Sequence, residues 1–149
     1  MRRRHLTRPA SGKADITMTT SNELRAGLMA VAKRSVSIMT ACCNEESSKL
    51  HLVLPFLGLL GYDYANPYEV YPNHAVSPDC KTDFAILRDG MPVIAIDACK
   101  AGADLYEERS KLARYFNAVA DVKLAILTNG TLFEFFVDSS VPGLSLIHI

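Results

Sequence analysis

The chain has 149 residues, of which 49% are hydrophobic and 21% are charged. This length and apolar content provide one compact domain but not comfortably two. The 16 basic and 16 acidic residues cancel to a formal net charge of zero, which argues against a broad basic face that grips nucleic acid by charge alone.

The first part of the chain predicts a leader followed by a helix. Met18 opens a more natural start, so we expect residues 1–17 to be a non-native or disordered leader. Apolar residues at helical spacing predict a helix over residues 22–41. This helix forms an N-terminal extension that spans residues 18–43.

A second helix is indicated more clearly. Asn44 fits an N-cap, and Glu45 and Glu46 fall in the first turn, where the helix dipole favours acidic side chains. The helix is expected to end at Gly61. Pro55 lies inside it and predicts a kink or a break.

A hairpin follows a segment rich in turn residues. Val70 is a candidate start for a short strand within that segment. Residues 81–87 and 92–98 read as two further strands, and they are joined at Asp89–Gly90, a dipeptide typical of tight hairpin turns.

The last elements complete the predicted fold. Residues 103–119 have the pattern of an amphipathic helix, residues 122–128 and 131–138 read as strands, and Asn129–Gly130 predicts a second hairpin turn. The order helix, strand, strand, helix, strand, strand predicts an α/β fold with a mixed central sheet flanked by helices. The helix between the hairpins is its crossover.

Other features bear on the compartment and on the end of the chain. The four cysteines lack CxxC spacing, so we expect reduced thiols in a cytoplasmic protein rather than a structural zinc site. The longest apolar stretch, residues 52–60, is too short to cross a bilayer, so no membrane association is expected. The tail LSLIHI looks like a translated sequencing adapter, and we expect residues 139–149 to be the truncated end of a longer chain.

Two aspartates flank the first predicted hairpin turn. Asp83 lies near the start of one strand and Asp97 at the end of the next, so antiparallel pairing sets the two carboxylates side by side. Carboxylate oxygens bind hard divalent cations such as Mg²⁺, and such a cation can polarise a phosphodiester and activate water. The alternative is that both acids are strand-end residues in solvent.

Five motifs follow one another along the chain: LPFLGLLGYD, DFAILRDGMPVIAI, KAGADL, RYFNA and ILTNG. With them, residues 44–138 resemble the N-terminal nuclease domain of type I restriction enzyme R subunits and its short stand-alone relatives in prophages and bacteria. The resemblance implies a restriction-endonuclease-like three-layer core, a PD-(D/E)xK motif, Mg²⁺ or Mn²⁺ as cofactor, and double-stranded DNA as substrate. It also implies restriction-modification subunits or motor domains as partners, although the chain itself contains no GxxxxGK[ST] P-loop.

The resemblance assigns roles to three acids of this chain. Glu46 matches the acid of the second helix, Asp83 matches the first metal-binding aspartate, and Asp97 stands where the family usually has glutamate. All three are therefore candidate metal ligands and catalytic residues. Aspartate is shorter by one methylene, so Asp97 keeps the ligand but reaches less far.

The lysine of the family motif is missing from its usual place. A match without a gap puts Cys99 at the lysine position and Lys100 one residue further on. Side chains at i and i+2 share one face of a strand, so we expect Cys99 beside Asp97 and Lys100 on the opposite face. Two residues can restore the charge: Lys100, if a β-bulge turns it inward, or Lys111, which faces the site from the following helix where the family commonly has glutamine. Lys111 is the favoured candidate.

Different functions stay open at this point. The first is a Mg²⁺-dependent DNA endonuclease domain with a degenerate motif. The second is a catalytically inactive nuclease-fold module for binding or assembly, which Cys99 and the neutral net charge favour. The third is a plain α/β domain whose acids all lie on the surface.

Overall fold

The computed structural model describes residues 21–42 and 44–138. Its helices are α1 (Ser21–Ile38), α2 (Glu45–Ser48), the π-helical segment η1 (Lys49–Val53), α3 (Leu54–Leu59) and α4 (Arg109–Ala118). Its strands are β1 (Val70–Ser77), β2 (Cys80–Arg88), β3 (Met91–Ala98), β4 (Leu124–Thr128) and β5 (Phe133–Val137). The leader and the truncated end expected from the sequence lie outside the described residues. Within the described ranges, no helix is long and apolar enough to cross a membrane.

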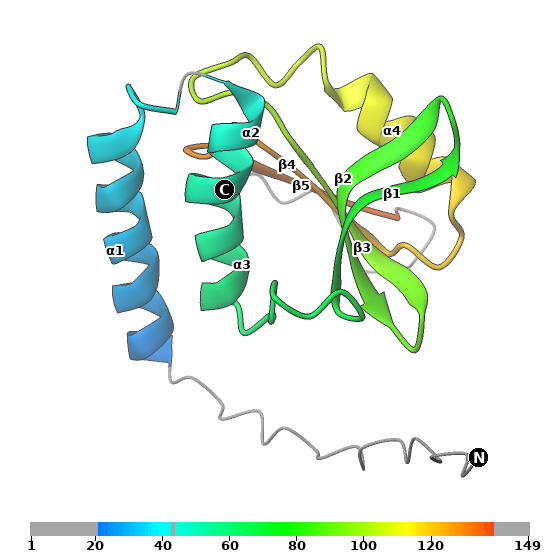
Figure 1. The fold of residues 1–149 in the computed structure, drawn as a ribbon, viewed down its shortest axis with the longest axis horizontal. Coiled ribbons are helices and arrows are strands. Elements are labelled where there is room, and N and C mark those ends of the chain that lie inside the picture. The colour runs from blue at the N-terminus through cyan, green and yellow to red at the C-terminus, as the bar shows by residue number, and fades with distance from the viewer. Residues whose placement is uncertain (1–20, 43, 139–149) are drawn as a thin grey trace, which may run out of the picture.

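The five strands form one mixed sheet in the order β1-β2-β3-β4-β5. Neighbouring strands are antiparallel except β3 and β4, which are parallel. Parallel neighbours need a crossover, and α4 supplies it between the two hairpins (Figure 1). The predicted α/β fold with a mixed central sheet flanked by helices is confirmed.

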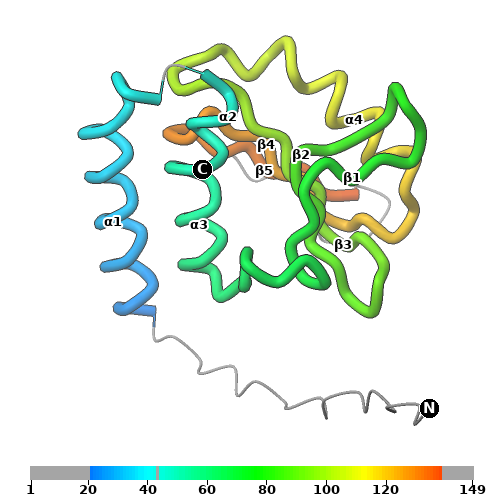
Figure 2. Tube along the Cα trace, in the orientation of Figure 1, coloured from blue at the N-terminus to red at the C-terminus, as the bar shows by residue number. Residues whose placement is uncertain are grey.

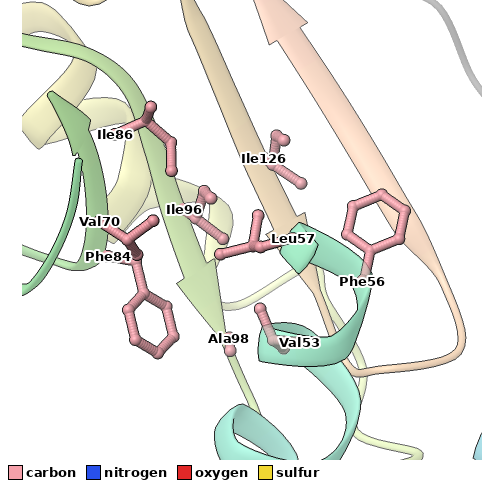
Figure 3. Packing of buried hydrophobic residues seen from close by; sticks show 9 residues of the cluster. All are labelled: Val53, Phe56, Leu57, Val70, Phe84, Ile86, Ile96, Ala98 and Ile126. Atoms are coloured by element: carbon pink, nitrogen blue, oxygen red, sulfur yellow. The ribbon is translucent and has the colours of Figure 1, made fainter. Parts of the chain in front are cut away.

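The core consists of two apolar layers, one on each face of the sheet. Alternate side chains of a buried strand point to opposite faces. On one face, Ile96 and Ile126 pack with Leu57 of α3 (Figure 3). On the other face, Ala95 packs with Leu112 of α4. The sheet is therefore the middle layer of a three-layer α/β core.

The helical stretch over α2, η1 and α3 begins as predicted but is not broken by its proline. Asn44 caps it, because the Ser47 N–H donates to Asn44 Oδ1 at 2.8 Å. The π-helical segment η1 precedes Pro55, and the chain stays helical to Leu59, shortly before Gly61. A proline ring in an α-helix meets the carbonyl one turn earlier, and a widened π turn displaces that carbonyl.

Both hairpin turns form where the sequence predicts them. Asp89 and Gly90 have φ angles of 53° and 79°, the left-handed pair that a tight turn between twisted strands requires. The connection between β4 and β5 is longer. Asn129 Oδ1 organises it by accepting hydrogen bonds from the N–H groups of Thr131 and Leu132.

Several element boundaries differ from the sequence prediction. α1 ends at Ile38 rather than at residue 41, and β4 and β5 begin at Leu124 and Phe133 rather than at residues 122 and 131. Two differences are larger. α4 begins at Arg109 rather than at residue 103, because the Asp104 side chain accepts the Tyr106 N–H at 3.0 Å and holds a turn there. β1 starts at Val70 as expected but is longer than the predicted short strand. It continues past Asn73, whose φ is 51°, because pairing with β2 overrides the local turn preference.

The outermost strand β1 is tied to α4 by one side-chain contact. Tyr115 Oη and His74 Nδ1 lie 2.6 Å apart, and the two rings meet edge to face. Burial raises the pKa of Tyr115 to about 12. This contact connects an edge of the sheet to the crossover helix.

Candidate active site

Asp83 and Asp97 meet where β2 and β3 diverge. Phe84 pairs with Ile96 in the ladder, so the next position sets the two aspartates opposite each other. Their proximity is as predicted, and a register shift between Ile86 and Leu87 makes the pairing direct. Beyond Phe84 and Ile96, hydrogen bonds to the two aspartate side chains replace the backbone hydrogen bonds between the strands. The Asp83 N–H donates to Asp97 Oδ1 at 2.9 Å, and the Ala98 N–H donates to Asp83 Oδ2 at 2.8 Å. We call Asp83 and Asp97 the acidic pair.

The acidic pair is buried rather than exposed. Asp83 is 6% exposed and Asp97 is 1% exposed, so the interpretation of both as strand-end acids in solvent is wrong. Thr82 Oγ1 donates to Asp97 Oδ1 at 2.8 Å. Asp97 Oδ2, in contrast, has no hydrogen-bond partner among the described residues. Burial, and then the charge of Asp83, raise the pKa of Asp97 above its ordinary value.

Lys111 faces the acidic pair from α4. Its Nζ lies 3.9 Å from Asp83 Oδ1 and 3.9 Å from Asp97 Oδ2, so it approaches both carboxylates without contacting either closely. The side chain is 32% exposed, so it is only partly shielded from solvent. The structure thus brings together the two aspartates and the favoured lysine of the sequence analysis.

Cys99 lies on the face of the sheet that the strand alternation predicts. Cys99 is buried in the apolar layer against α4, together with Ala95, and its Sγ donates to the Thr128 carbonyl at 3.5 Å. Burial, and then the charge of Glu108, raise the pKa of the Cys99 thiol to about 11, so the thiol is neutral at physiological pH. Lys100 is exposed.

The β-bulge that would turn Lys100 inward is absent from the described strands. β3 keeps its register with β4 to its last residue, and the Cys99 N–H continues the pairing by donating to the Thr128 carbonyl at 2.9 Å. The bulge was one of two ways to restore a charge at the motif. Regular pairing across the end of β3 excludes it, and Lys111 is the remaining candidate of the two.

A second lysine, Lys49, was missed by the sequence analysis. It is only 8% exposed, and its Nζ lies 2.9 Å from Asp83 Oδ1, 2.7 Å from Glu45 Oε1 and 3.1 Å from Glu46 Oε1. Burial alone lowers a lysine pKa, but here the hydrogen bonds to Glu45 and Asp83 outweigh it and hold the pKa of Lys49 above its ordinary value. The available signal was a lysine just before an apolar run, with glutamates three and four residues before it.

Glu46 reaches the acidic pair only through Lys49. Its side chain is 84% exposed and contacts the Lys49 ammonium, whereas Asp83 and Asp97 are buried. Among the described residues, no three His, Cys, Asp or Glu side chains gather so that they could hold a metal ion. A cation at this site therefore depends on the acidic pair, with Glu46 outside the immediate ligand set in this conformation.

The helix that carries Lys49 is fixed to the chain that follows β3. The Ala101 N–H donates to Ser48 Oγ at 2.9 Å, and Ser48 Oγ in turn donates to the Asn44 carbonyl at 3.1 Å. Figure 2 shows the start of α2 beside this segment. The contact sets the position of η1 relative to the end of β3, and so the distance between Lys49 and the acidic pair.

The oxygens of the acidic pair fit a hard divalent cation. Asp97 Oδ2 is a buried acceptor without a hydrogen-bond partner among the described residues. Lys111 Nζ lies 3.9 Å from this oxygen and 3.9 Å from Asp83 Oδ1. Mg²⁺ commonly binds through one or two carboxylates and completes its shell with water. The thiol of Cys99 does not suit such a cation, because Mg²⁺ prefers oxygen.

Comparison of the chain with models of protein families, with curated proteins and with solved structures gives no significant match.

The chemistry open to the acidic pair and its two lysines follows from their own geometry. Two buried carboxylates can hold a cation, and an ammonium beside them can stabilise an anion that the cation binds.

Proposed function

We propose that this chain is a PD-(D/E)xK-type nuclease domain that hydrolyses phosphodiester bonds of double-stranded DNA with Mg²⁺ or Mn²⁺ as cofactor. One observation carries the proposal: within the described ranges Asp97 Oδ2 of the buried acidic pair has no hydrogen-bond partner, and Lys111 Nζ lies 3.9 Å from both carboxylates. The resemblance of five sequence motifs to those of type I restriction enzyme R subunits supports it. We extend the proposal to a cytoplasmic location and to restriction-modification subunits or motor domains as partners.

Each residue of the site has a distinct role in this proposal. Asp83 and Asp97 hold the cation, which lowers the pKa of an attacking water when it is bound. Lys111 supplies the positive charge that the neutral Cys99 cannot supply, and it stabilises negative charge that develops on the phosphate. Thr82 keeps Asp97 oriented through its hydroxyl.

A second candidate is a nuclease-fold module that binds or assembles without catalysis. Lys49 favours it, because its ammonium already occupies Asp83 Oδ1 at 2.9 Å. The neutral thiol at the lysine position of the motif favours it as well. In this case the acidic pair and Lys49 form a structural ion-pair network.

A nicking assay with supercoiled plasmid distinguishes the two candidates. We expect the purified chain to nick DNA in Mg²⁺, Asp83→Ala to abolish both nicking and Mn²⁺ binding in calorimetry, and Lys111→Ala to slow nicking by about 100-fold, the typical effect of one electrostatic stabiliser. Lys123→Ala is the matched control, because Lys123 is an exposed lysine immediately before β4.

Cys99→Lys completes the variant set. It restores an ammonium beside Asp97, so it should recover part of the activity lost in Lys111→Ala. Circular dichroism must show that the variant folds, because Cys99 is buried. Mn²⁺ binding without nicking in the wild type and in Cys99→Lys would support the binding module, and absence of Mn²⁺ binding in the wild type would overturn the nuclease proposal.

A further inference from the structure

Two lysines approach the acidic pair from opposite sides of the sheet. Lys49 comes from η1 and Lys111 from α4. Lys49 Nζ lies 2.9 Å from Asp83 Oδ1, a full ångström closer than Lys111 Nζ at 3.9 Å. The carboxylate oxygen that a divalent cation would use is therefore already neutralised by an ammonium of the chain itself.

Binding of a divalent cation to Asp83 Oδ1 costs free energy as long as the Lys49 ammonium contacts the same oxygen. Both are positive, and at such distances inside a protein their repulsion is strong because little water screens it. Cation binding therefore requires Lys49 Nζ to withdraw from Asp83. The structure offers a place to withdraw to, because Glu45 and Glu46 already contact the same ammonium at 2.7 and 3.1 Å.

The surroundings of Lys49 leave room for this movement. A cavity of about 260 Å³ adjoins the side chain between η1 and β1, and Glu46, Lys49 and Asp83 are among the residues that line it. The Glu46 side chain is 84% exposed and can follow the ammonium. A lysine stem is flexible and its charge needs no fixed direction, so a short displacement exchanges Asp83 for solvent while the glutamates stay in contact.

We propose that Lys49 is an internal competitor for the divalent cation: it neutralises Asp83 in the cation-free protein and moves to Glu45 and Glu46 when a cation binds the acidic pair. The inference rests on the proposed cation site and adds a control of its occupancy. Lys49 lowers the affinity of the acidic pair for the cation and keeps buried Asp83 compensated when no cation is present. Lys49 is thus a positioning residue for the site and takes no part in bond cleavage.

Calorimetry with Mn²⁺ on the full chain tests the competition. Lys49→Met removes the charge and keeps most of the length of the side chain. An opposite charge beside a carboxylate changes its proton affinity by roughly 10- to 1,000-fold, and we expect Lys49→Met to bind Mn²⁺ at least about tenfold more tightly than the wild type. Lys49→Arg keeps the charge and should bind no more tightly than the wild type, and the exposed control Lys123→Met should be unchanged.

Thermal unfolding gives a second, independent measurement. Without Mn²⁺, Lys49→Met should melt at a lower temperature than the wild type, because Asp83 has lost its closest charged partner. With saturating Mn²⁺, its melting temperature should rise by more than that of the wild type, because tighter binding stabilises more. If Lys49→Met does not fold, Lys49→Gln provides the same comparison.

The outcomes separate this inference from the proposed function. Equal or weaker Mn²⁺ binding by Lys49→Met, with measurable binding by the wild type, overturns the competition and leaves the cation site intact. Tighter binding by Lys49→Arg overturns it as well, since the charge would then not be the cause. Absence of Mn²⁺ binding in the wild type and in both neutral variants overturns the cation site and the competitor together.

Discussion

Replacing Asp97 by asparagine is expected to stabilise the protein in the absence of divalent cations. The substitution keeps Oδ1, which accepts hydrogen bonds from Thr82 Oγ1 and the Asp83 N–H. It turns Oδ2, which has no partner among the described residues, into part of an uncharged amide. A buried charge with incomplete compensation opposes folding, so removing this charge should raise the free energy of unfolding.

The expected increase in the free energy of unfolding follows from the missing hydrogen bond of Asp97 Oδ2. Leaving a buried polar atom unsatisfied costs roughly 1–3 kcal/mol. The new amide Nδ2 also lacks a full set of partners, so we expect the lower part of that range, about 1–2 kcal/mol. For a chain of 149 residues, this corresponds to a rise in melting temperature of about 3–6 °C.

The gain should depend on pH in a defined direction. The pKa of Asp97 is raised above 3.8 in the folded protein, so the folded state holds this proton more tightly than the unfolded state. The contribution of Asp97 to stability is therefore complete below pH 3.8 and is lost as the pH rises through the higher folded pKa. The difference between Asp97→Asn and the wild type should be small in acid and should widen toward neutral pH.

Thermal unfolding in EDTA, followed by circular dichroism, measures this difference. Asp121→Asn is the matched control, because Asp121 is exposed and its substitution should change stability by less than about 0.5 kcal/mol. Asp83→Asn should act in the opposite direction and lower the melting temperature, because it removes the buried carboxylate that lies 2.9 Å from the Lys49 ammonium. A melting temperature of Asp97→Asn at or below that of the wild type at neutral pH would refute the reasoning, as would a difference that does not vary with pH.

Two further predictions concern the fold. Gly130→Ala should destabilise the chain by about 2 kcal/mol or more in urea unfolding, because φ is 86° and a Cβ would clash with Leu52. The control Gly61→Ala has φ 93° and nothing near the added Cβ, so it should cost only about 1 kcal/mol. Equal losses of stability in the two variants would contradict the clash. Tyr115→Phe should lose about 1 kcal/mol near pH 8 with the contact to His74. The folded pKa of Tyr115 is about 12 and the ordinary value is 10.0, so the wild type loses stability from pH 10 upward. The difference in unfolding free energy between the wild type and Tyr115→Phe should therefore shrink above pH 10. A difference that grows with pH would contradict the raised pKa.

The sequence predicted the parts of the fold that depend on local chemistry. Asp89 and Gly90 tolerate positive φ and therefore mark the first hairpin turn. The turn brings Asp83 and Asp97 close together, as predicted, but its register alone would set Asp83 opposite Ile96. A one-residue register shift between Ile86 and Leu87, which the sequence does not show, sets Asp83 opposite Asp97. Asn44 capped its helix for an equally local reason, a side-chain oxygen within reach of a free N–H.

Features that depend on contacts between distant segments could not be predicted. Lys49 forms an ion pair with Asp83 only because η1 and β2 come together in the folded chain. The spacing of Lys49 to Glu45 and Glu46 is equally typical of an exposed helix face. The length of β1 was missed because pairing with β2 extends the strand through Asn73. Helix periodicity likewise did not show where α4 begins, since the turn at Asp104 competes with it.

The π-helical segment η1 sets the rotational phase of the helix that delivers Lys49. Buried residues recur in pairs every four positions along this stretch: Ser48 and Lys49, Leu52 and Val53, Phe56 and Leu57. In a regular α-helix, steps of four residues drift around the axis by about 40° each, so a stripe of this spacing would turn away from the sheet. The wider π turn cancels part of that drift. A deletion of one residue within η1 would leave the core contacts of α3 in phase but rotate Lys49 and both glutamates away from Asp83, so the backbone irregularity itself is part of how the charge reaches the acidic pair.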